Sequence, residues 1–169
     1  GLRDLHLDLG HVGVFRALAA EARLSEELEG DLFEALQRKA RSQIEALLAT
    51  CDAPTGTKAM LAVLADLNGG TETLIRAREL LKGAPPAVQV ALINLERVAD
   101  AVTTAGTPVY IDLAELRGYR YYTGVVFSAF VSGQGQAVAQ GGRYDGIGRA
   151  FGRARAATGF STDLRRLLR

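Results

Sequence analysis

Hydrophobic and polar residues alternate at the beginning of the chain. Between residues 2 and 9, leucines at every second position from Leu5 onward are separated by polar residues that include His6 and Asp8. A period of two residues is typical of a strand with one buried face. We predict a strand here that ends at Gly10, because this glycine interrupts the alternation.

A helical period replaces this alternation over the middle of the chain. Hydrophobic residues recur every three or four positions, starting with Val14 and Leu18. Ser25 is placed to cap a long amphipathic helix, and Thr71 is placed to cap a later one. The sequence Asn68-Gly69-Gly70 is typical of a helix end. We predict helices over residues 14–22, 28–47, 58–67, 72–82 and 86–102.

Alternation returns after Pro108. We expect Gly141 and Gly142 to end a hairpin strand, and Ser161 or Thr162 to cap a last helix. A helical block between an early strand and later antiparallel strands predicts an α+β fold, since a doubly wound sheet alternates strands and helices regularly. The predicted strands cover residues 109–113, 125–131, 136–140 and 156–160, and a short helix is predicted over 145–151.

The bulk composition excludes several classes of protein. No apolar run in the 169 residues approaches the roughly 20 residues that span a bilayer. Cys51 is the only cysteine, so there is no internal disulfide, and a lone cysteine of this kind fits an inert core residue. The sequence begins with Gly1, close to the first predicted strand, which indicates a fragment that lacks the N-terminal part of its domain.

Charge is distributed unevenly, although the net charge is only +1. Residues 1–107 contain 11 Lys and Arg against 15 Asp and Glu, whereas residues 108–169 contain nine Arg, no Lys, and four Asp and Glu. Arginine without lysine favours bidentate recognition of carboxylate or phosphate over diffuse binding of nucleic acid. An arginine-rich genomic composition explains the same counts, so charge alone does not identify a partner.

A tyrosine-rich segment is the first candidate site. Arg117 precedes Tyr119, Tyr121 and Tyr122, and glycines flank the run. A cation, tyrosine hydroxyls and an accessible backbone could hold a small zwitterion. The alternative is an ordinary edge strand with tyrosines at its rim. The pattern of residues leaves both interpretations open.

The sequence gives no support for a metal site, a dinucleotide-binding site or a hydrolase active site. His6 and His11 flank Asp8, but this spacing across a strand end is not that of a metal site, so we predict no metal. The Gly133-x-Gly135 turn lacks the third glycine of a dinucleotide fingerprint. No nucleophile elbow or phosphate-binding loop occurs, and we predict neither a cofactor nor a catalytic residue.

Three motifs, in order, resemble the histidyl-tRNA synthetase family. They are Arg117–Gly124, Gly141–Gly146 with the sequence Gly-Gly-Arg-Tyr-Asp-Gly, and the segment that begins at Gly159-Phe160. The resemblance implies an antiparallel sheet like that of class II aminoacyl-tRNA synthetases. It further implies one partial domain over residues 1–169, with a helical insertion over about 24–106 and the C-terminal sheet and final motif over about 108–169.

The same resemblance implies a histidine-binding pocket. In that family an arginine matching Arg117 contacts the amino-acid carboxylate and the activated phosphate. The tyrosines that match lie along the histidine pocket, and two glycines form a strand end at its floor. The residues carried over are Arg117, Tyr121, Tyr122, Gly141, Gly142 and Tyr144.

Two departures from the family pattern bear on activity. Arg120 stands where the family has an aspartate before the tyrosine pair, and Asp163 stands where it has a glycine in the final motif. A carboxylate at that place would repel the phosphates of ATP. With these two departures, and with its sequence over residues 7–15 and 146–155, the chain resembles the regulatory subunits of short-form ATP phosphoribosyltransferase. That family is related to the synthetases.

That second resemblance implies a non-catalytic, cytoplasmic subunit in the first step of histidine biosynthesis. It would bind the catalytic phosphoribosyltransferase subunit in a hetero-octamer and mediate feedback by L-histidine, with no membrane and no tRNA as partner. Two alternatives stay open. The chain could be a fragment of a true histidyl-tRNA synthetase, or a scaffold of that fold that binds no ligand.

Overall fold

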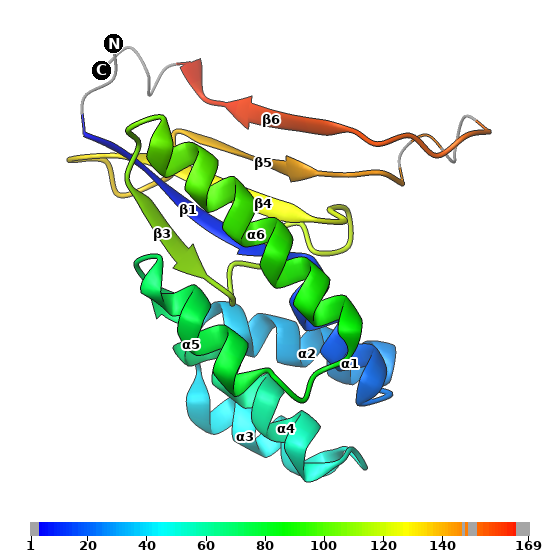
Figure 1. Cartoon of the computed structure of the whole chain (residues 1–169). Coiled ribbons are helices and arrows are strands. Elements are labelled where there is room, and N and C mark those ends of the chain that lie inside the picture. The colour runs from blue at the N-terminus through cyan, green and yellow to red at the C-terminus, as the bar shows by residue number, and fades with distance from the viewer. Residues whose placement is uncertain (1–3, 147, 149–151, 165–169) are drawn as a thin grey trace.

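A mixed sheet of six strands forms the centre of the molecule (Figure 1). The strands are β1 (Leu5–His11), β2 (Asn68–Gly69), β3 (Val109–Asp112), β4 (Val125–Val131), β5 (Ala139–Arg143) and β6 (Thr158–Thr162). The computed structural model describes residues 4–146, 148 and 152–164. The strand order is β2-β3-β1-β4-β5-β6, in which β1 and β3 are parallel and the other neighbours are antiparallel.

The helices occupy the long crossover that the parallel pair β1 and β3 requires. They are α1 (Val12–Glu21), α2 (Glu26–Gln37), α3 (Arg41–Thr50), α4 (Thr55–Val63), a 3-10 helix (Leu64–Asp66), α5 (Glu72–Leu80) and α6 (Pro86–Thr104). In Figure 1, α6 crosses one face of the sheet, and α2–α5 gather beyond the end where β1 and β3 finish. Within the described residues, no helix is both long and apolar enough to span a bilayer.

The two faces of the sheet have different characters. Odd-numbered residues of β1, such as Leu9, belong to the core that the helices cover, and Leu7 packs against that core. Even-numbered residues, such as Asp8 and its β4 partner Ser128, point to the opposite face. The predicted alternation of β1 and the α+β class are therefore confirmed. We call the face that carries Asp8 and Ser128 the open face.

One continuous core joins the helices to the sheet. Phe15 of α1 and Leu95 of α6 are fully buried, as is Ile111 of β3, and all three belong to the same cluster. Helix α6 begins with Pro86 at its first position, where a missing N–H costs no helical hydrogen bond. The helical block and the strands therefore stabilise each other.

The strand β1 does not end at Gly10, as the alternation had indicated. It continues to His11, and Gly10 pairs with Val126. A Cβ atom built on Gly10 would lie 2.6 Å from the carbonyl oxygen of Glu115. Glycine is needed at this position because another backbone segment crosses the strand here, so its presence marks a close approach rather than a strand end.

The prediction of one long helix over residues 28–47 is also wrong, because the chain forms two helices there, α2 and α3. Between them Lys39 has a φ angle of 51°, which interrupts the helical path. The Lys39 ammonium lies 2.8 Å from the Asp112 carboxylate at the end of β3. The capping prediction is confirmed, since Ser25 accepts a hydrogen bond from the Leu28 N–H. The i, i+4 periodicity could not reveal this tertiary ion pair.

Asn68 and Gly69 form a strand instead of only closing a helix. They pair with Asp112 and Ile111 of β3, and the Asn68 amide also accepts a hydrogen bond from the Tyr110 hydroxyl. Thr71 precedes α5 as predicted, but its side chain makes no capping hydrogen bond.

In the C-terminal third, the strands begin and end at residues other than the predicted ones. Gly141 and Gly142 lie inside β5, and the residues from 136 to 138 precede the strand. Ser161 and Thr162 belong to β6 and so do not cap a helix. The helix predicted over 145–151 lies partly outside the described residues, and the predicted last helix lies largely outside them.

The tyrosine-rich segment is a turn, although a strand seemed the simplest interpretation. The N–H groups of Tyr121 and Tyr122 both donate to the carbonyl of Gly118, whose φ angle is +66°. This positive φ angle is one that glycine adopts without steric cost. The turn reverses the chain between β3 and β4.

Gly10→Ala should lower the free energy of unfolding by about 1–3 kcal/mol, because the added methyl group meets backbone atoms that cannot move aside. Gly56→Ala is the matched control, since nothing lies within 4 Å of a Cβ atom on that helical glycine. The control should be neutral or stabilising by about 0.5–1 kcal/mol. Urea denaturation measures both variants, and equal stabilities would contradict the close approach at Gly10.

Candidate functional site

Three glycines and one valine form a row across the open face. Gly10 of β1 pairs with Val126 of β4, Val126 with Gly142 of β5, and Gly142 with Gly159 of β6. We call these four residues the glycine row. The three glycines leave space directly above the backbone of β1, β5 and β6, whereas Val126 places a side chain above β4.

Two nearby segments occupy this space. The loop over residues 113–124, here called the covering loop, places the Glu115 carbonyl over Gly10 and the Tyr122 ring over Gly142. A Cβ atom on Gly142 would be 3.0 Å from that ring, and one on Gly159 would be 2.3 Å from the Tyr144 hydroxyl. The glycine row therefore determines how closely the tyrosines approach the sheet.

Three tyrosine rings come together above the row. The ring centroids of Tyr121 and Tyr144 are 4.9 Å apart, those of Tyr121 and Tyr122 are 5.3 Å apart, and those of Tyr122 and Tyr144 are 6.3 Å apart. We call them the tyrosine cluster. Burial raises the pKa of Tyr122, and the hydroxyls of Tyr121 and Tyr144 add to the rise. The Tyr122 hydroxyl is therefore neutral at physiological pH and can both donate and accept a hydrogen bond.

Asp145 fixes the cluster to the sheet, a role that the sequence motif did not reveal. Its carboxylate accepts hydrogen bonds from the Arg143 side chain at 2.9 Å and from the Ala157 N–H at 3.2 Å. Its own N–H donates to the Thr123 hydroxyl at 3.1 Å. The hydrogen bond from Arg143 holds the pKa of Asp145 below its usual value. The covering loop, β5 and the approach to β6 therefore meet at one aspartate, through its N–H and its carboxylate.

A second row on the open face is polar. Tyr110, Asp8, Ser128, Gln140 and Ser161 are successive register partners across β3, β1, β4, β5 and β6. We call these residues the polar row. Four of these side chains are at least partly exposed, whereas Ser128 at the centre of the row is only 2% exposed.

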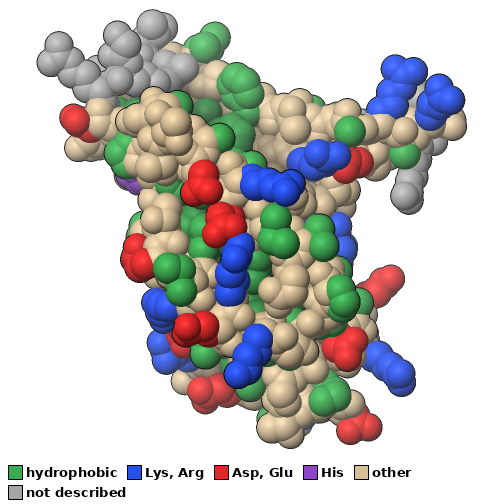
Figure 2. All heavy atoms as spheres, in the orientation of Figure 1, with side chains coloured by type: hydrophobic (Ala, Val, Ile, Leu, Met, Phe, Trp, Pro, Cys, Tyr) green, Lys and Arg blue, Asp and Glu red, His purple; other side chains and the backbone are tan. Residues whose placement is uncertain are grey.

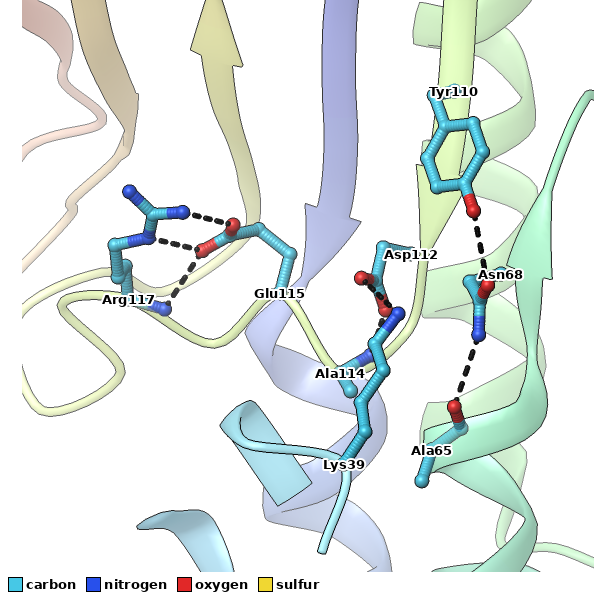
Figure 3. A network of polar contacts seen from close by, with 8 residues as sticks. All are labelled: Lys39, Ala65, Asn68, Tyr110, Asp112, Ala114, Glu115 and Arg117. Carbon is cyan, nitrogen blue, oxygen red and sulfur yellow. Dashed lines mark hydrogen bonds and ion pairs between the residues drawn. The ribbon is translucent and has the colours of Figure 1, made fainter. Parts of the chain in front are cut away.

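Arg117 lies on the open face and is already paired within the chain (Figure 3). Its Nε atom donates to Glu115 Oε1 at 3.1 Å, and its guanidinium donates to Glu115 Oε2 at 3.0 Å. The Arg117 N–H also donates to Oε1. The Glu115 side chain is 9% exposed and that of Arg117 is 51% exposed. Arg117 thus keeps an accessible edge for a second anion while Glu115 holds its orientation.

Arg117 and the far strands border a pocket of about 590 Å³. Gln140 and Ser161 of the polar row line it, together with Phe130 and Thr162. We call this the polar pocket, and its volume lies within the range of small-molecule sites, about 300–1,000 Å³. Burial raises the pKa of the nearby Asp8, His6 opposes this rise, and the carboxylates of Glu115 and Asp112 add to it.

The predicted site residues are thus only partly assembled. Tyr121, Tyr122 and Tyr144 form one cluster, and Gly142 lies beneath Tyr122. Arg117 borders the polar pocket, which the three tyrosines do not line. A Cβ atom on Gly141 would point at Phe127 and Phe160, on the helix-covered side of the sheet. Gly141 therefore faces away from the other five.

The helix-covered side has a groove of its own, about 1,180 Å³ in volume, between α1, α6 and β4–β6. Val90 and Val98 of α6 line it, as does Phe160, which is 69% exposed. Figure 2 shows this side of the molecule, where hydrophobic side chains lie among Lys and Arg side chains. The groove is mainly apolar, although His11, Arg16 and Arg143 are among the polar residues that line it.

His11 ends β1 and caps α1 at the edge of this groove. Its Nδ1 atom accepts a hydrogen bond from the Gly13 N–H at 3.0 Å. Burial lowers the pKa of His11 to about 4, and the positive charge of Arg16 acts in the same direction. The imidazole is neutral at physiological pH. Among the residues that the structure describes, no set of three His, Cys, Asp or Glu side chains could hold a metal ion.

Comparison with known proteins places these features in a family context. The family model described as histidyl-tRNA synthetase matches residues 1–167. The ATP phosphoribosyltransferase regulatory subunit of Pseudomonas aeruginosa strain LESB58 is 57% identical over 167 residues, which are 98% of this chain and 42% of the relative. The subunit of the same name from Azotobacter vinelandii strain DJ is 56% identical over equal shares.

A solved structure gives the same result. The crystal structure of an ATP phosphoribosyltransferase regulatory subunit/histidyl-tRNA synthetase from Bacillus halodurans C has a TM-score of 0.84 and 29% identity. The alignment covers 99% of this chain and 44% of that one. The resemblance drawn from the three sequence motifs is thereby confirmed. The chain spans about two fifths of the length of the curated relatives it matches.

The pKa of His11 predicts a specific pH dependence of stability. Since the pKa is about 4 in the folded chain and about 6.5 in the unfolded chain, the unfolded state binds the extra proton between these values. The contribution of His11 to the free energy of unfolding is therefore fully present above pH 6.5 and is lost as the pH falls towards 4. The loss should be on the order of 3 kcal/mol.

His11→Asn keeps a capping acceptor but removes this titration. Chemical denaturation of both proteins at several pH values between 4 and 7 isolates the His11 contribution, because carboxylates titrate equally in each. A stability difference that stays constant over this range would show that His11 is not held neutral by burial.

Proposed function

This chain belongs to the histidyl-tRNA synthetase family, and we propose that it forms part of a non-catalytic regulatory subunit of ATP phosphoribosyltransferase. The observation that carries the proposal is 57% identity, over 98% of the chain, with a relative of that name. The subunit would support the first step of histidine biosynthesis and bind L-histidine as the feedback effector. The division into a helical insertion over about 24–106 and a C-terminal sheet is part of the same proposal.

The surroundings of Arg120 support a loss of aminoacylation. The residue replaces the family's aspartate, and its side chain borders a hollow that Glu26 and Glu29 of α2 also line. Burial raises the pKa of Glu29, and the positive charges of Arg16 and, to a smaller extent, Arg120 oppose this rise. The reversed charge is thus matched to the acidic beginning of α2 and is directed away from the tyrosine cluster.

The position of Asp163 supports the same conclusion. It follows β6, where its N–H donates to the carbonyl of Val138, and it borders the polar pocket. A carboxylate at the edge of this pocket would repel a polyphosphate but tolerate a zwitterionic amino acid. We therefore expect the pocket to favour a zwitterionic amino acid over ATP.

The open face offers complementary groups for histidine. The accessible edge of Arg117 would bind the carboxylate, and Tyr122 and Tyr144 would orient the imidazole ring through their hydroxyls. Gly142 lets Tyr122 lie against the sheet. These roles, with Tyr121 and Gly141 as neighbouring elements, are the proposed assignments for the six residues carried over from the family.

The partner in this proposal is the catalytic subunit of short-form ATP phosphoribosyltransferase. A regulatory subunit acts only through such a complex, which we propose to be a hetero-octamer in the cytoplasm that does not involve tRNA. Feedback requires that histidine binding and catalysis be coupled by a free energy, typically about 1–3 kcal/mol.

Replacing Arg117 should weaken histidine binding by about 10- to 100-fold, the usual effect of losing a charge-assisted hydrogen bond. Calorimetry with L-histidine, on a protein that contains this chain, measures the change. Because Arg117→Ala strands a buried Glu115 carboxylate, the double variant Glu115→Gln/Arg117→Gln separates binding from stability. Arg153→Ala, an exposed arginine on the β5–β6 connection, is the control. Unchanged affinity in both variants would remove Arg117 from the site.

Co-purification with the catalytic subunit tests the partner. Tagged phosphoribosyltransferase should retain the protein and gain activity that L-histidine inhibits. The competing function is that of a histidyl-tRNA synthetase, which the name of the family model favours. Histidine-dependent exchange of pyrophosphate into ATP by the purified protein would establish that alternative and refute the regulatory role.

A further inference from the structure

A single arginine of α1 reaches the turn that carries the tyrosine cluster. One terminal guanidinium nitrogen of Arg16 donates to the Tyr119 carbonyl at 2.6 Å and to the Tyr122 carbonyl at 3.0 Å. These partners are more than 100 residues away in the sequence. Arg16 thus joins the helix that follows β1 to both ends of the turn in the covering loop.

The hydrogen bonds of Arg16 add to those that the turn makes internally. The Tyr119 N–H donates to the Leu116 carbonyl, and the N–H groups of Tyr121 and Tyr122 donate to the Gly118 carbonyl. Across the described residues, Arg16 is the only donor to the carbonyls of Tyr119 and Tyr122. Without Arg16 these two carbonyls would lose partners at a partly buried place, which is unfavourable.

Aromatic contacts secure the same attachment. The Tyr119 ring lies 5.4 Å from the Phe15 ring of α1 and 5.3 Å from the Phe33 ring of α2, centroid to centroid. The Arg16 guanidinium carbon lies 5.3 Å from the Tyr119 centroid, within the range of a cation–π interaction. Tyr119 is therefore held against the helices, while Tyr121 and Tyr122 contact Tyr144 on the open face.

We propose that Arg16 is the positioning residue for the tyrosine cluster. It acts through the backbone of Tyr119 and Tyr122 and touches no ring of the cluster in any contact described above. A shift of α1 would consequently move the tyrosines relative to the glycine row. The consequence for L-histidine rests on the function proposed above, whereas the positioning of the tyrosines does not.

The chemistry requires an arginine. A planar guanidinium can donate to two carbonyls while its face covers a ring, whereas a lysine ammonium is a compact charge without that planar geometry. Arg16→Lys should therefore preserve the charge but only part of the positioning. Arg16→Gln should lose the cation and most of the geometry.

Tyrosine circular dichroism in the near ultraviolet gives a direct test. The chain has no tryptophan and five tyrosines, of which Tyr119, Tyr121, Tyr122 and Tyr144 lie at this turn or in the cluster. We expect Arg16→Gln to lose at least half of the tyrosine signal, with an unchanged far-ultraviolet spectrum. The tyrosine signal of Arg16→Lys should lie between that of Arg16→Gln and that of the parent protein. Arg76→Gln, an exposed arginine of α5, is the matched control and should retain the parent signal.

Calorimetry with L-histidine on the same proteins separates the two proposals. If histidine binds the parent, Arg16→Gln should weaken binding by about tenfold, as expected for two lost hydrogen bonds, and Arg16→Lys by less. An unchanged tyrosine signal in Arg16→Gln would overturn the positioning role, and so would a signal lost equally in Arg16→Gln and Arg76→Gln. Should Arg16→Gln fail to fold, the spectrum of Arg16→Lys decides, and a parent-like spectrum refutes the role. No heat from the parent would refute histidine binding alone.

Discussion

The close approach of the covering loop to the glycine row is the constraint on which the rest of the site depends. Gly10, Gly142 and Gly159 have no side chains, so the Glu115 carbonyl, the Tyr122 ring and the Tyr144 hydroxyl can lie directly on the sheet. A larger residue at any of these three glycines would hold the loop or the tyrosines away from the sheet.

The helices hold this loop at both ends. Lys39, between α2 and α3, binds Asp112 where the loop begins, and Arg16 of α1 binds the carbonyls of Tyr119 and Tyr122 near its end. An exposed ion pair contributes little stability by itself. Here the two cations instead bind the covering loop near its two ends. The helical block is therefore structurally linked to the open face.

In the proposed function, the described part of the candidate site offers groups for an amino acid, and a carboxylate there disfavours a polyphosphate. Arg117 is oriented by Glu115, the tyrosine cluster presents neutral hydroxyls, and Asp163 borders the polar pocket. Arg120, the second departure from the synthetase pattern, is accommodated by the acidic start of α2. The two departures thus have separate local surroundings, and both agree with the proposed role of a histidine sensor.

The sequence by itself determined the alternation of β1, the cap at Ser25, the α+β class and the family, because these depend on local spacing and on three short motifs. Only the tertiary structure decided those features that depend on contacts between residues far apart in the sequence. At the break between α2 and α3, Lys39 forms an ion pair with Asp112, and β1 continues through Gly10 at the point where a distant backbone segment crosses it. The opposite directions of Gly141 and Gly142 follow from the register of β5, a one-residue difference that places adjacent residues on opposite faces. Arg16 gave no signal in the sequence, since its partners are backbone carbonyls, which any residue at those positions would supply.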